Sequence, residues 1–319
     1  MSPVELTPLK RAMIREIHIE NFRGIENLHL SFVGPDGQPC RAIALGGPNG
    51  SGKTTVLEAI LLAAGRESLL HGPFGRGAVR AGCRDYRIAA KFQSGEGFHE
   101  VECHSTITTR PVGVSCDYFP SWRAPKLIGP VSVSGGKKGK RRAAQEVNRL
   151  SQIKQYLVDA KAYSSMSADQ PLRSAYEEII SRINNLWEKF YPGSGQSFSA
   201  EPAGESPAEG FDVFLNMGQH RVPLDCLSSG QLELFMFAGA WLPGAVWPSI
   251  LCIDEPELHL DASWHRLIVR TLMQMGQDCQ FIVGTHSSEV FDSFYSFQRH
   301  FLSANLEATE VPAERGARP

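Results

Sequence analysis

Apolar and polar residues alternate in four segments of the N-terminal part of the chain. Residues 14–20 and 28–32 place apolar side chains at every second position, on either side of a turn at residues 21–25. Residues 87–92 and 99–108 repeat the pattern across a short glycine-containing turn. The pattern predicts two pairs of strands that form an N-terminal antiparallel β subdomain.

Three other apolar runs are continuous rather than alternating, at residues 41–45, 249–253 and 280–285. Such runs are typical of parallel strands that are buried on both faces. Helical spacing of apolar residues at 56–64 and 263–275 predicts a helix after the first run and another between the last two. We therefore predict an α/β fold.

The middle of the chain predicts two long helices. Apolar residues recur at helical spacing in residues 143–166 and 172–191, which correspond to about five to seven turns each. Helices of this length are too short for a long coiled-coil arm. Residues 194–210 are rich in Gly, Pro, Ser and Glu and predict a loop, whereas 211–216 predict a strand and 227–241 a strongly apolar helix.

At 319 residues, the chain is long enough for one large α/β domain or two smaller ones. The expected regions are an N-terminal lobe, a helical insertion with a loop, a C-terminal lobe and an unstructured tail, at residues 1–134, 135–205, 206–303 and 304–319.

The composition argues against a strongly basic protein, a zinc-binding protein and a membrane or secreted protein. Hydrophobic residues make up 42% of the chain, and the net charge of −2 gives no overall basic signal for nucleic acid or membrane. The seven cysteines lack the spacing of a zinc site, which favours reduced thiols. No apolar run approaches the ~20 residues that span a bilayer, and the first 15 residues lack the apolar core of a signal peptide. We expect a soluble cytoplasmic protein with no membrane partner.

Two segments stay open to more than one interpretation. The aromatic and proline-containing residues 118–123 suit either packing or a functional contact. The basic run at residues 137–142 suits either a solvated loop or contact with nucleic acid, because charge alone gives only a salt-sensitive attraction that does not depend on sequence.

Residues 44–55 contain a phosphate-binding motif. From Gly47 they match the spacing G-x-x-x-x-G-K-S/T, between a predicted strand and a predicted helix. Glycines let backbone N–H groups turn toward a phosphate, Lys53 can neutralise its oxygens, and the Thr54 hydroxyl can bind Mg²⁺. A glycine-rich turn without a ligand is the alternative, but the complete motif favours a nucleoside triphosphate. The predicted ligand residues are Asn49, Gly50, Ser51, Gly52, Lys53, Thr54 and Thr55.

Polar side chains also follow the other two buried strands. Asp254 and Glu255 end one strand and His286 ends the other. Ligands of open α/β sheets bind at the carboxyl ends of the strands, so these residues are expected beside the phosphate loop. There Asp254 can hold Mg²⁺ through water, Glu255 can orient or deprotonate an attacking water, and His286 can bond the terminal phosphate.

Several motifs together resemble one family. Leu227-Ser228-Ser229-Gly230-Gln231 resembles the signature motif of ABC-type ATPases and lies just upstream of Ile253-Asp254-Glu255-Pro256. Residues 17–25 and 47–55 resemble the opening strand and phosphate loop of the SMC/RecF/OLD branch. The chain is thus similar to an SMC/RecF/OLD-like ATPase of the AAA class, over residues 14–65 and 211–300. No acidic cluster of the TOPRIM nuclease type follows His286.

This resemblance implies a P-loop NTPase fold with a two-lobed head, and two such heads that enclose ATP and Mg²⁺ between them. Ser228 and Gly230 would then contact the γ-phosphate bound to the partner chain, Asp261 would lie in the D-loop, and Arg23 would lie near the nucleotide. Ser228 is also a residue typical of a helix N-cap, and both roles can hold. Gln93 and residues 111–134 are alternative locations for the Q-loop.

The expected function is a Mg²⁺-dependent ATPase that forms head-to-head dimers, or larger assemblies, and acts on a separate effector protein, on DNA or on RNA. Genome maintenance and anti-phage defence are the processes that the resemblance suggests. A membrane transporter motor is the first alternative, but the acidic and apolar residues 232–237 differ from the basic helix start of transporter heads. An ATP-gated scaffold with little turnover is the second alternative.

Overall fold

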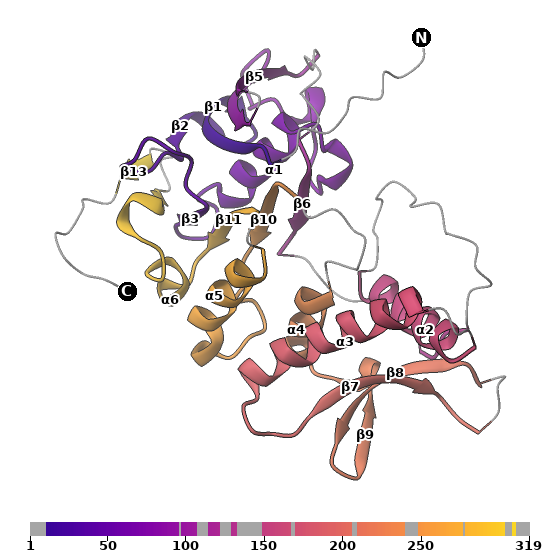
Figure 1. Cartoon of the computed structure of the whole chain (residues 1–319). Coiled ribbons are helices and arrows are strands. Elements are labelled where there is room, and N and C mark those ends of the chain that lie inside the picture. The colour runs from indigo at the N-terminus through magenta and orange to yellow at the C-terminus, as the bar shows by residue number, and fades with distance from the viewer. Residues whose placement is uncertain are drawn as a thin grey trace. The chain divides into compact units, whose positions relative to one another are not determined.

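The computed structural model describes residues 11–95, 97–106, 114–121, 129–132, 149–166, 170–205, 209–239, 248–276, 278–303 and 308–310. The chain divides into two compact units (Figure 1). The first comprises Met1–Arg123, Trp247–Leu258 and His265–Pro319, and the second comprises Ala124–Val246 and His259–Trp264. The basic run at residues 137–142 lies outside the described residues.

The first unit contains the predicted antiparallel sheet. Its strands follow the order β2-β1-β4-β5, and every neighbouring pair is antiparallel. Period-two alternation buries one face of this sheet, as the sequence predicts. The bounds are β1 (Met13–Phe22), β2 (Ile25–Ser31), β4 (Arg87–Ser94) and β5 (Gly97–His104).

A second sheet in this unit is mostly parallel, with the order β13-β12-β3-β11-β10-β6. Every residue of β3, β10 and β11 is buried, which explains their continuous apolar sequences. Only β13, within the predicted unstructured tail, is antiparallel to its neighbour. The bounds are β3 (Ala42–Gly46), β6 (Cys116–Phe119), β10 (Ile250–Asp254), β11 (Gln280–Thr285), β12 (Arg299–Leu302) and β13 (Ala308–Glu310).

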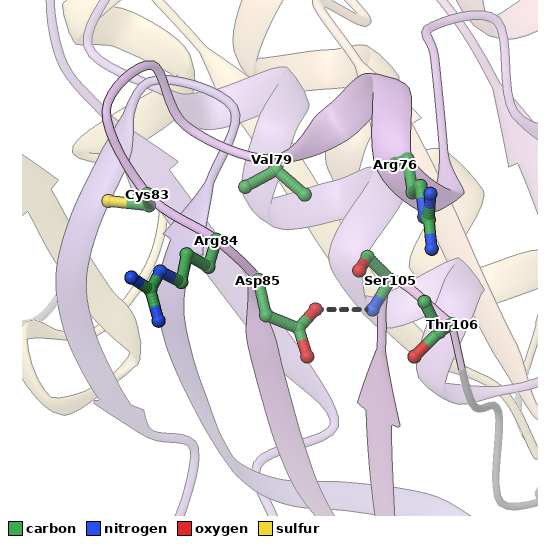
Figure 2. Close-up of a pocket in the computed structure, with 7 residues that line it drawn as sticks. All are labelled: Arg76, Val79, Cys83, Arg84, Asp85, Ser105 and Thr106. Atoms are coloured by element: carbon green, nitrogen blue, oxygen red, sulfur yellow. Dashed lines mark hydrogen bonds between the residues drawn. The ribbon is translucent and has the colours of Figure 1, made fainter.

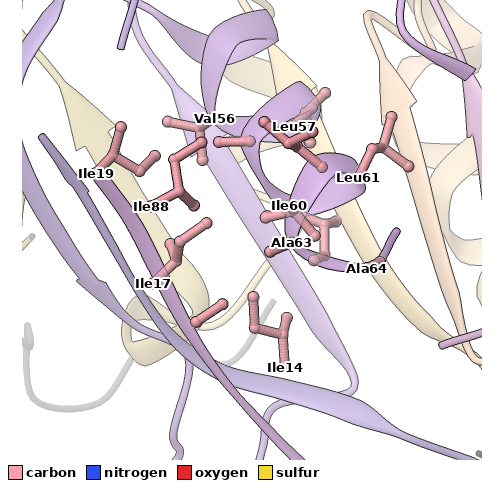
Figure 3. Close-up of a cluster of buried hydrophobic side chains, with 14 of the residues drawn as sticks. Ile14, Ile17, Ile19, Val56, Leu57, Ile60, Leu61, Ala63, Ala64 and Ile88 are labelled. Atoms are coloured by element: carbon pink, nitrogen blue, oxygen red, sulfur yellow. The ribbon is translucent and has the colours of Figure 1, made fainter. Parts of the chain in front are cut away.

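Helix α1 (Lys53–Ala63) contacts strands of both sheets and lies between them. Figure 3 shows Ile17, Ile19 and Ile88 of the antiparallel sheet facing Val56 and Ile60 of this helix. All five side chains are fully buried. Burial of each one stabilises the folded state by about 1.5–3 kcal/mol, compared with the same side chain exposed to water. This core fixes the helix that follows the phosphate loop.

The other α-helices in the described part of the first unit are α5 (His265–Met275) and α6 (Ser288–Phe291). A helix was predicted at residues 263–275. In the structure, its first residues belong to a 3₁₀ turn, Ala262–Trp264, and α5 follows directly. Helix α6 contacts β3 and β11. None of the helices in the described ranges combines the length and apolar character needed to cross a membrane.

The second unit contains α2 (Arg149–Met166), α3 (Gln170–Phe190) and α4 (Ser229–Gly239), and an antiparallel sheet of order β7-β8-β9. Its strands are β7 (Ser197–Pro202), β8 (Phe211–Met217) and β9 (His220–Pro223). The loop predicted at residues 194–210 is wrong where β7 lies. Phe198 and Ala200 are buried there and pair with β8, so a short alternation outweighs a composition typical of loops.

His300 on β12 gives the first unit a pH-dependent stability. Its side chain is buried, its ring lies 5.5 Å from that of Phe32, and burial lowers its pKa from 6.5 to about 4. Between these pH values the unfolded chain binds the proton and the folded chain does not, so stability decreases as the pH falls, by about 1.4 kcal/mol per pH unit at most.

We therefore expect His300→Phe to flatten the decrease in melting temperature between pH 6.5 and 4.5. Melting curves at several pH values measure this slope. Equal slopes in the variant and the parent would show that His300 does not titrate in this way.

Candidate nucleotide site

The phosphate loop connects β3 to α1. Gly50 and Gly52 have φ values of 81° and 94°, in the left-handed region that favours glycine. Gly52 is the N-cap of α1, and Lys53 and Thr54 begin the helix. The glycines of the motif are therefore required by the backbone of this turn, and the loop ends at a helix N-terminus, where anions bind.

Lys53 is only 5% exposed, and its ammonium group donates to the carbonyl oxygens of Gly47 and Pro48 at 2.7 and 3.0 Å. The lysine thus lies across the inside of the loop. A bound phosphate would offer this charge a stronger, charge-assisted partner than a neutral carbonyl.

Thr54 and Asp254 meet where α1 begins and β10 ends. The Thr54 hydroxyl donates to Oδ2 of Asp254 at 2.6 Å, and Asp254 is only 1% exposed. A hydroxyl and a carboxylate are hard oxygen donors of the kind that Mg²⁺ selects, together with water and phosphate. This pair therefore fits a Mg²⁺ ion, although the sequence alone could not show that the two oxygens are adjacent.

A cavity of about 550 Å³ lies against the loop, which is within the range of small-molecule sites. It brings together six of the seven predicted loop residues with Glu255, and adds Gly24 and Ile25 from the β1–β2 turn. Ser51 is buried and is not part of the lining. The lining residues are Gly24, Ile25, Asn49, Gly50, Gly52, Lys53, Thr54, Thr55 and Glu255.

Glu255 and His286 lie together at the ends of β10 and β11. The Glu255 backbone has a φ of 53°, unusual for a residue with a side chain, and its N–H donates to the Gly284 carbonyl at 2.7 Å. Oε1 of Glu255 lies 3.2 Å from Nδ1 of His286. The imidazole is 48% exposed, so it remains accessible to a ligand.

Glu257, which follows β10, binds the end of β11, and the sequence motifs above assign it no role. Its Oε1 accepts from the Thr285 hydroxyl at 2.5 Å and from the N–H groups of His286 and Ser287 at 3.1 and 3.2 Å. The carboxylate is almost fully buried. The available signal was a second acidic residue, directly after the proline that follows Glu255.

We expect Glu257→Ala to lower both stability and any activity that depends on His286. The Thr285 hydroxyl and the His286 N–H lose their acceptor, whereas the Ser287 N–H keeps the Thr285 hydroxyl oxygen at 3.0 Å. Each buried group left unsatisfied costs about 1–3 kcal/mol. Denaturant unfolding measures the loss. Glu289→Ala is the control, because this exposed residue makes local hydrogen bonds, to the neighbouring Ser287 and Ser288 hydroxyls and to its own backbone, so its change should stay within about 0.5 kcal/mol. Equal effects of the two variants would contradict the role of Glu257.

Arg23 is not among the residues that line the cavity. Its guanidinium forms an ion pair with Glu58 of α1 and donates to the Pro73 carbonyl at 2.9 and 3.1 Å. Oε1 of Glu58 also accepts from the N–H groups of His71 and Gly72. Arg23 therefore fixes the β1–β2 turn against α1, while its neighbours Gly24 and Ile25 reach the cavity.

Ser228 and Gly230 belong to the second unit, whereas the site residues described above belong to the first. Ser228 precedes α4, and its Oγ lies 3.4 Å from the Gln231 N–H, while Oε1 of Gln231 accepts from the Ser228 N–H at 3.0 Å. This reciprocal pair is a capping box. A Cβ at Gly230 would lie 2.5 Å from the His259 carbonyl, so only glycine allows this approach. Ser228 itself is exposed.

A second cavity of the first unit, of about 490 Å³, contains none of the predicted site residues (Figure 2). Asp85 lies in it and accepts a hydrogen bond from the Ser105 N–H at 2.8 Å. Hydrogen bonds from Ser105 lower the pKa of this carboxyl. Its lining residues are Arg76, Val79, Cys83, Arg84, Asp85, Ser105 and Thr106.

Two family models match the chain. One, described as "AAA domain", covers residues 16–183, and the other, described as "AAA domain, putative AbiEii toxin, Type IV TA system", covers residues 153–292. No curated protein matches.

Several solved structures are similar to the chain. An SMC head bound to the C-winged helix domain of ScpA is 13% identical, over 94% of this chain and 98% of that one, with a TM-score of 0.58. An SMC head with an extended coiled coil, bound to the C-terminal domain of ScpA from Pyrococcus furiosus, is 14% identical, over 94% and 96%, with a TM-score of 0.50. At this identity the likeness shows the fold, which is that of an ABC-type ATPase head.

Proposed function

The chain belongs to the AAA-domain family and has the fold of an SMC-like ATPase head, and from this premise we propose that it binds ATP with Mg²⁺ and hydrolyses it between two copies of itself. One observation supports this most strongly. The carboxyl ends of β3, β10 and β11 bring together residues from three separate segments of the chain. These residues are Lys53, Thr54, Asp254, Glu255 and His286.

Each residue has a distinct role in the proposed reaction. Lys53 and the N–H groups of the loop would hold the β and γ phosphates, and Thr54 and Asp254 would hold Mg²⁺, which when bound would neutralise charge on the phosphate oxygens. Glu255 orients the attacking water and accepts its proton, and His286 bonds the γ-phosphate. The cavity has space for the nucleotide next to the loop.

The second copy supplies the signature helix. Ser228 is exposed at the N-terminus of α4, an 11-residue helix whose first turn contains no acidic residue. Such a terminus attracts anions through its N–H groups and its partial positive charge. We propose that it contacts the γ-phosphate held by the partner copy, together with Gly230.

Steady-state ATP turnover at several protein concentrations tests this proposal. Hydrolysis that requires a dimer rises faster than linearly with concentration, and removal of Mg²⁺ by EDTA abolishes it. Turnover that stays strictly proportional to concentration down to concentrations at which the protein is monomeric would contradict the paired site. ATP-dependent dimers without turnover would favour the scaffold alternative, and co-purification with a membrane subunit would favour the transporter alternative.

We propose that a separate effector protein or DNA receives the output, in genome maintenance or defence. The matched SMC heads are bound to ScpA, which supports a protein partner for heads of this fold. A local basic surface supports DNA. Arg80 pairs with Glu26 and Arg87 with Glu20 and Glu102, whereas Arg76 and Arg84 have no acidic partner in the part of the chain that the structure describes.

We expect Arg76→Ala/Arg84→Ala to weaken binding of duplex DNA and to make its salt dependence shallower by up to about 1.8 in the logarithmic slope, for two lost phosphate contacts. Fluorescence anisotropy at several salt concentrations measures this. Arg80→Ala/Arg87→Ala removes the same charge from paired positions and serves as the control. Unchanged slopes would exclude this surface and favour the effector protein.

A further inference from the structure

A buried ion cluster in the second unit takes no part in the reaction described above. Lys154 of α2 is completely buried, and its ammonium group lies 2.7 Å from Oδ1 of Asp212 and 2.8 Å from Oδ2 of Asp225. Asp212 is on β8, and Asp225 lies in the 3₁₀ turn Leu224–Cys226. A buried charge is costly unless it is paired, so this arrangement firmly links three elements.

The link to Asp225 ends three residues before Ser228. Asp225 also accepts from the Gly129 N–H at 2.8 Å, and Leu224 is fully buried. The Leu227 N–H then donates to the Leu224 carbonyl at 3.1 Å. The backbone that enters the signature helix is therefore fixed through Asp225, and through it to Lys154 on α2.

Helix α2 also contacts the other end of the signature helix. A Cβ at Gly239, the last residue of α4, would lie 2.6 Å from Ile153, the neighbour of Lys154. Adjacent residues of α2 thus contact the C-terminal end of α4 and the turn before its N-terminus. A displacement of α2 would be transmitted to the position of Ser228.

We propose that Lys154 and Asp225 are positioning residues for the signature motif, which link the helical insertion to the presentation of Ser228. The inference rests on the proposed function, in which Ser228 contacts nucleotide on a partner copy. Asp212 pairs with the same lysine but leads to β8 and not to the signature turn. The two aspartates therefore allow a matched comparison. Both neutralise Lys154, but only Asp225 lies in the turn that leads to Ser228.

The test compares Asp225→Asn with Asp212→Asn, each in a Glu255→Gln chain that retains ATP. Each variant leaves Lys154 with one carboxylate, so we expect similar losses in melting temperature. Nucleotide affinity of the monomer should stay unchanged, because the residues proposed to bind a chain's own nucleotide, those of the phosphate loop with Asp254, lie in the first unit. In ATP, Asp225→Asn should weaken dimerisation by about 5- to 150-fold, whereas Asp212→Asn should change it far less. Analytical ultracentrifugation measures the dimer constants.

Asp225→Glu provides a second measurement that does not depend on the loss of charge. It keeps the ion pair and lengthens the link by one methylene, so dimerisation should weaken while the melting temperature stays close to that of the parent. Equal dimer constants for the two Asn variants, from a parent that dimerises, would overturn the inference alone. A parent that stays monomeric in ATP would contradict the proposed function and the inference with it.

Discussion

Lys53→Ala is expected to abolish ATP binding at concentrations at which the parent is saturated. The ammonium group lies within the phosphate loop, 2.7 Å from the Gly47 carbonyl, and among the described residues that line the cavity no other side chain supplies a positive charge. A charge-assisted hydrogen bond contributes about 1.5–3 kcal/mol, which corresponds to at least about a tenfold loss of affinity. The loss of the contacts inside the loop adds to this.

Titration of a fluorescent ATP analogue measures this affinity. Lys91→Ala is the matched control, because Lys91 lies in the same unit and pairs with Glu100 at the surface. The control should bind ATP like the parent. Undiminished affinity of Lys53→Ala would show that the nucleotide binds elsewhere.

Glu255→Gln is expected to bind ATP and to lose hydrolysis by about 10²- to 10⁴-fold, the usual contribution of a general base. Glutamine keeps the shape of the side chain and an acceptor for the nearby His286, but it cannot take a proton from water. The rate of single-turnover hydrolysis should therefore fall while the affinity for nucleotide stays. As a result, the ATP-bound dimer should accumulate.

Glu100→Gln is the control for this variant. Glu100 is exposed on β5 and pairs with Lys91, so its neutralisation should leave turnover unchanged. A Glu255→Gln chain that hydrolyses ATP at the parental rate would exclude Glu255 as the base. Rapid-quench measurement with saturating ATP and Mg²⁺ distinguishes these outcomes.

The elements that were predictable are those whose burial leaves a simple pattern in the sequence. The predicted α/β fold class is confirmed. It was predictable because β10 and β11 are buried on both faces and therefore appear as continuous apolar runs in the sequence. Strand β7 was not predictable, since only Phe198 and Ala200 mark its alternation among residues typical of loops. Short strands with small or polar residues carry little periodic signal.

Site residues that belong to a motif could be selected in advance, whereas those that bond to backbone groups could not. Lys53, Thr54, Asp254 and Glu255 follow from spacing, and their roles stay predictions for the experiments above. Glu257 binds N–H groups at the end of a strand that lies almost 30 residues further along the chain. The acidic residue after Pro256 is visible in the sequence, but the backbone N–H groups that it binds are not.

Charge placement inside the second unit is similarly invisible in the sequence. Lys154 lies in a segment that was predicted as a helix, four residues after Leu150 and three before Leu157, so helical spacing places it on the apolar face but does not show which groups pair with its charge. Only the fold brings Asp212 and Asp225 to it from distant positions.

The most direct test of a site shared between two copies is a mixing experiment with two inactive variants. Lys53→Ala removes the phosphate loop lysine, and Ser228→Arg blocks the signature helix, so each alone should show no turnover. In an equal mixture, half of the dimers contain one complete site, and turnover should recover to about a quarter of the parental rate. A mixture as inactive as its two components would contradict the account.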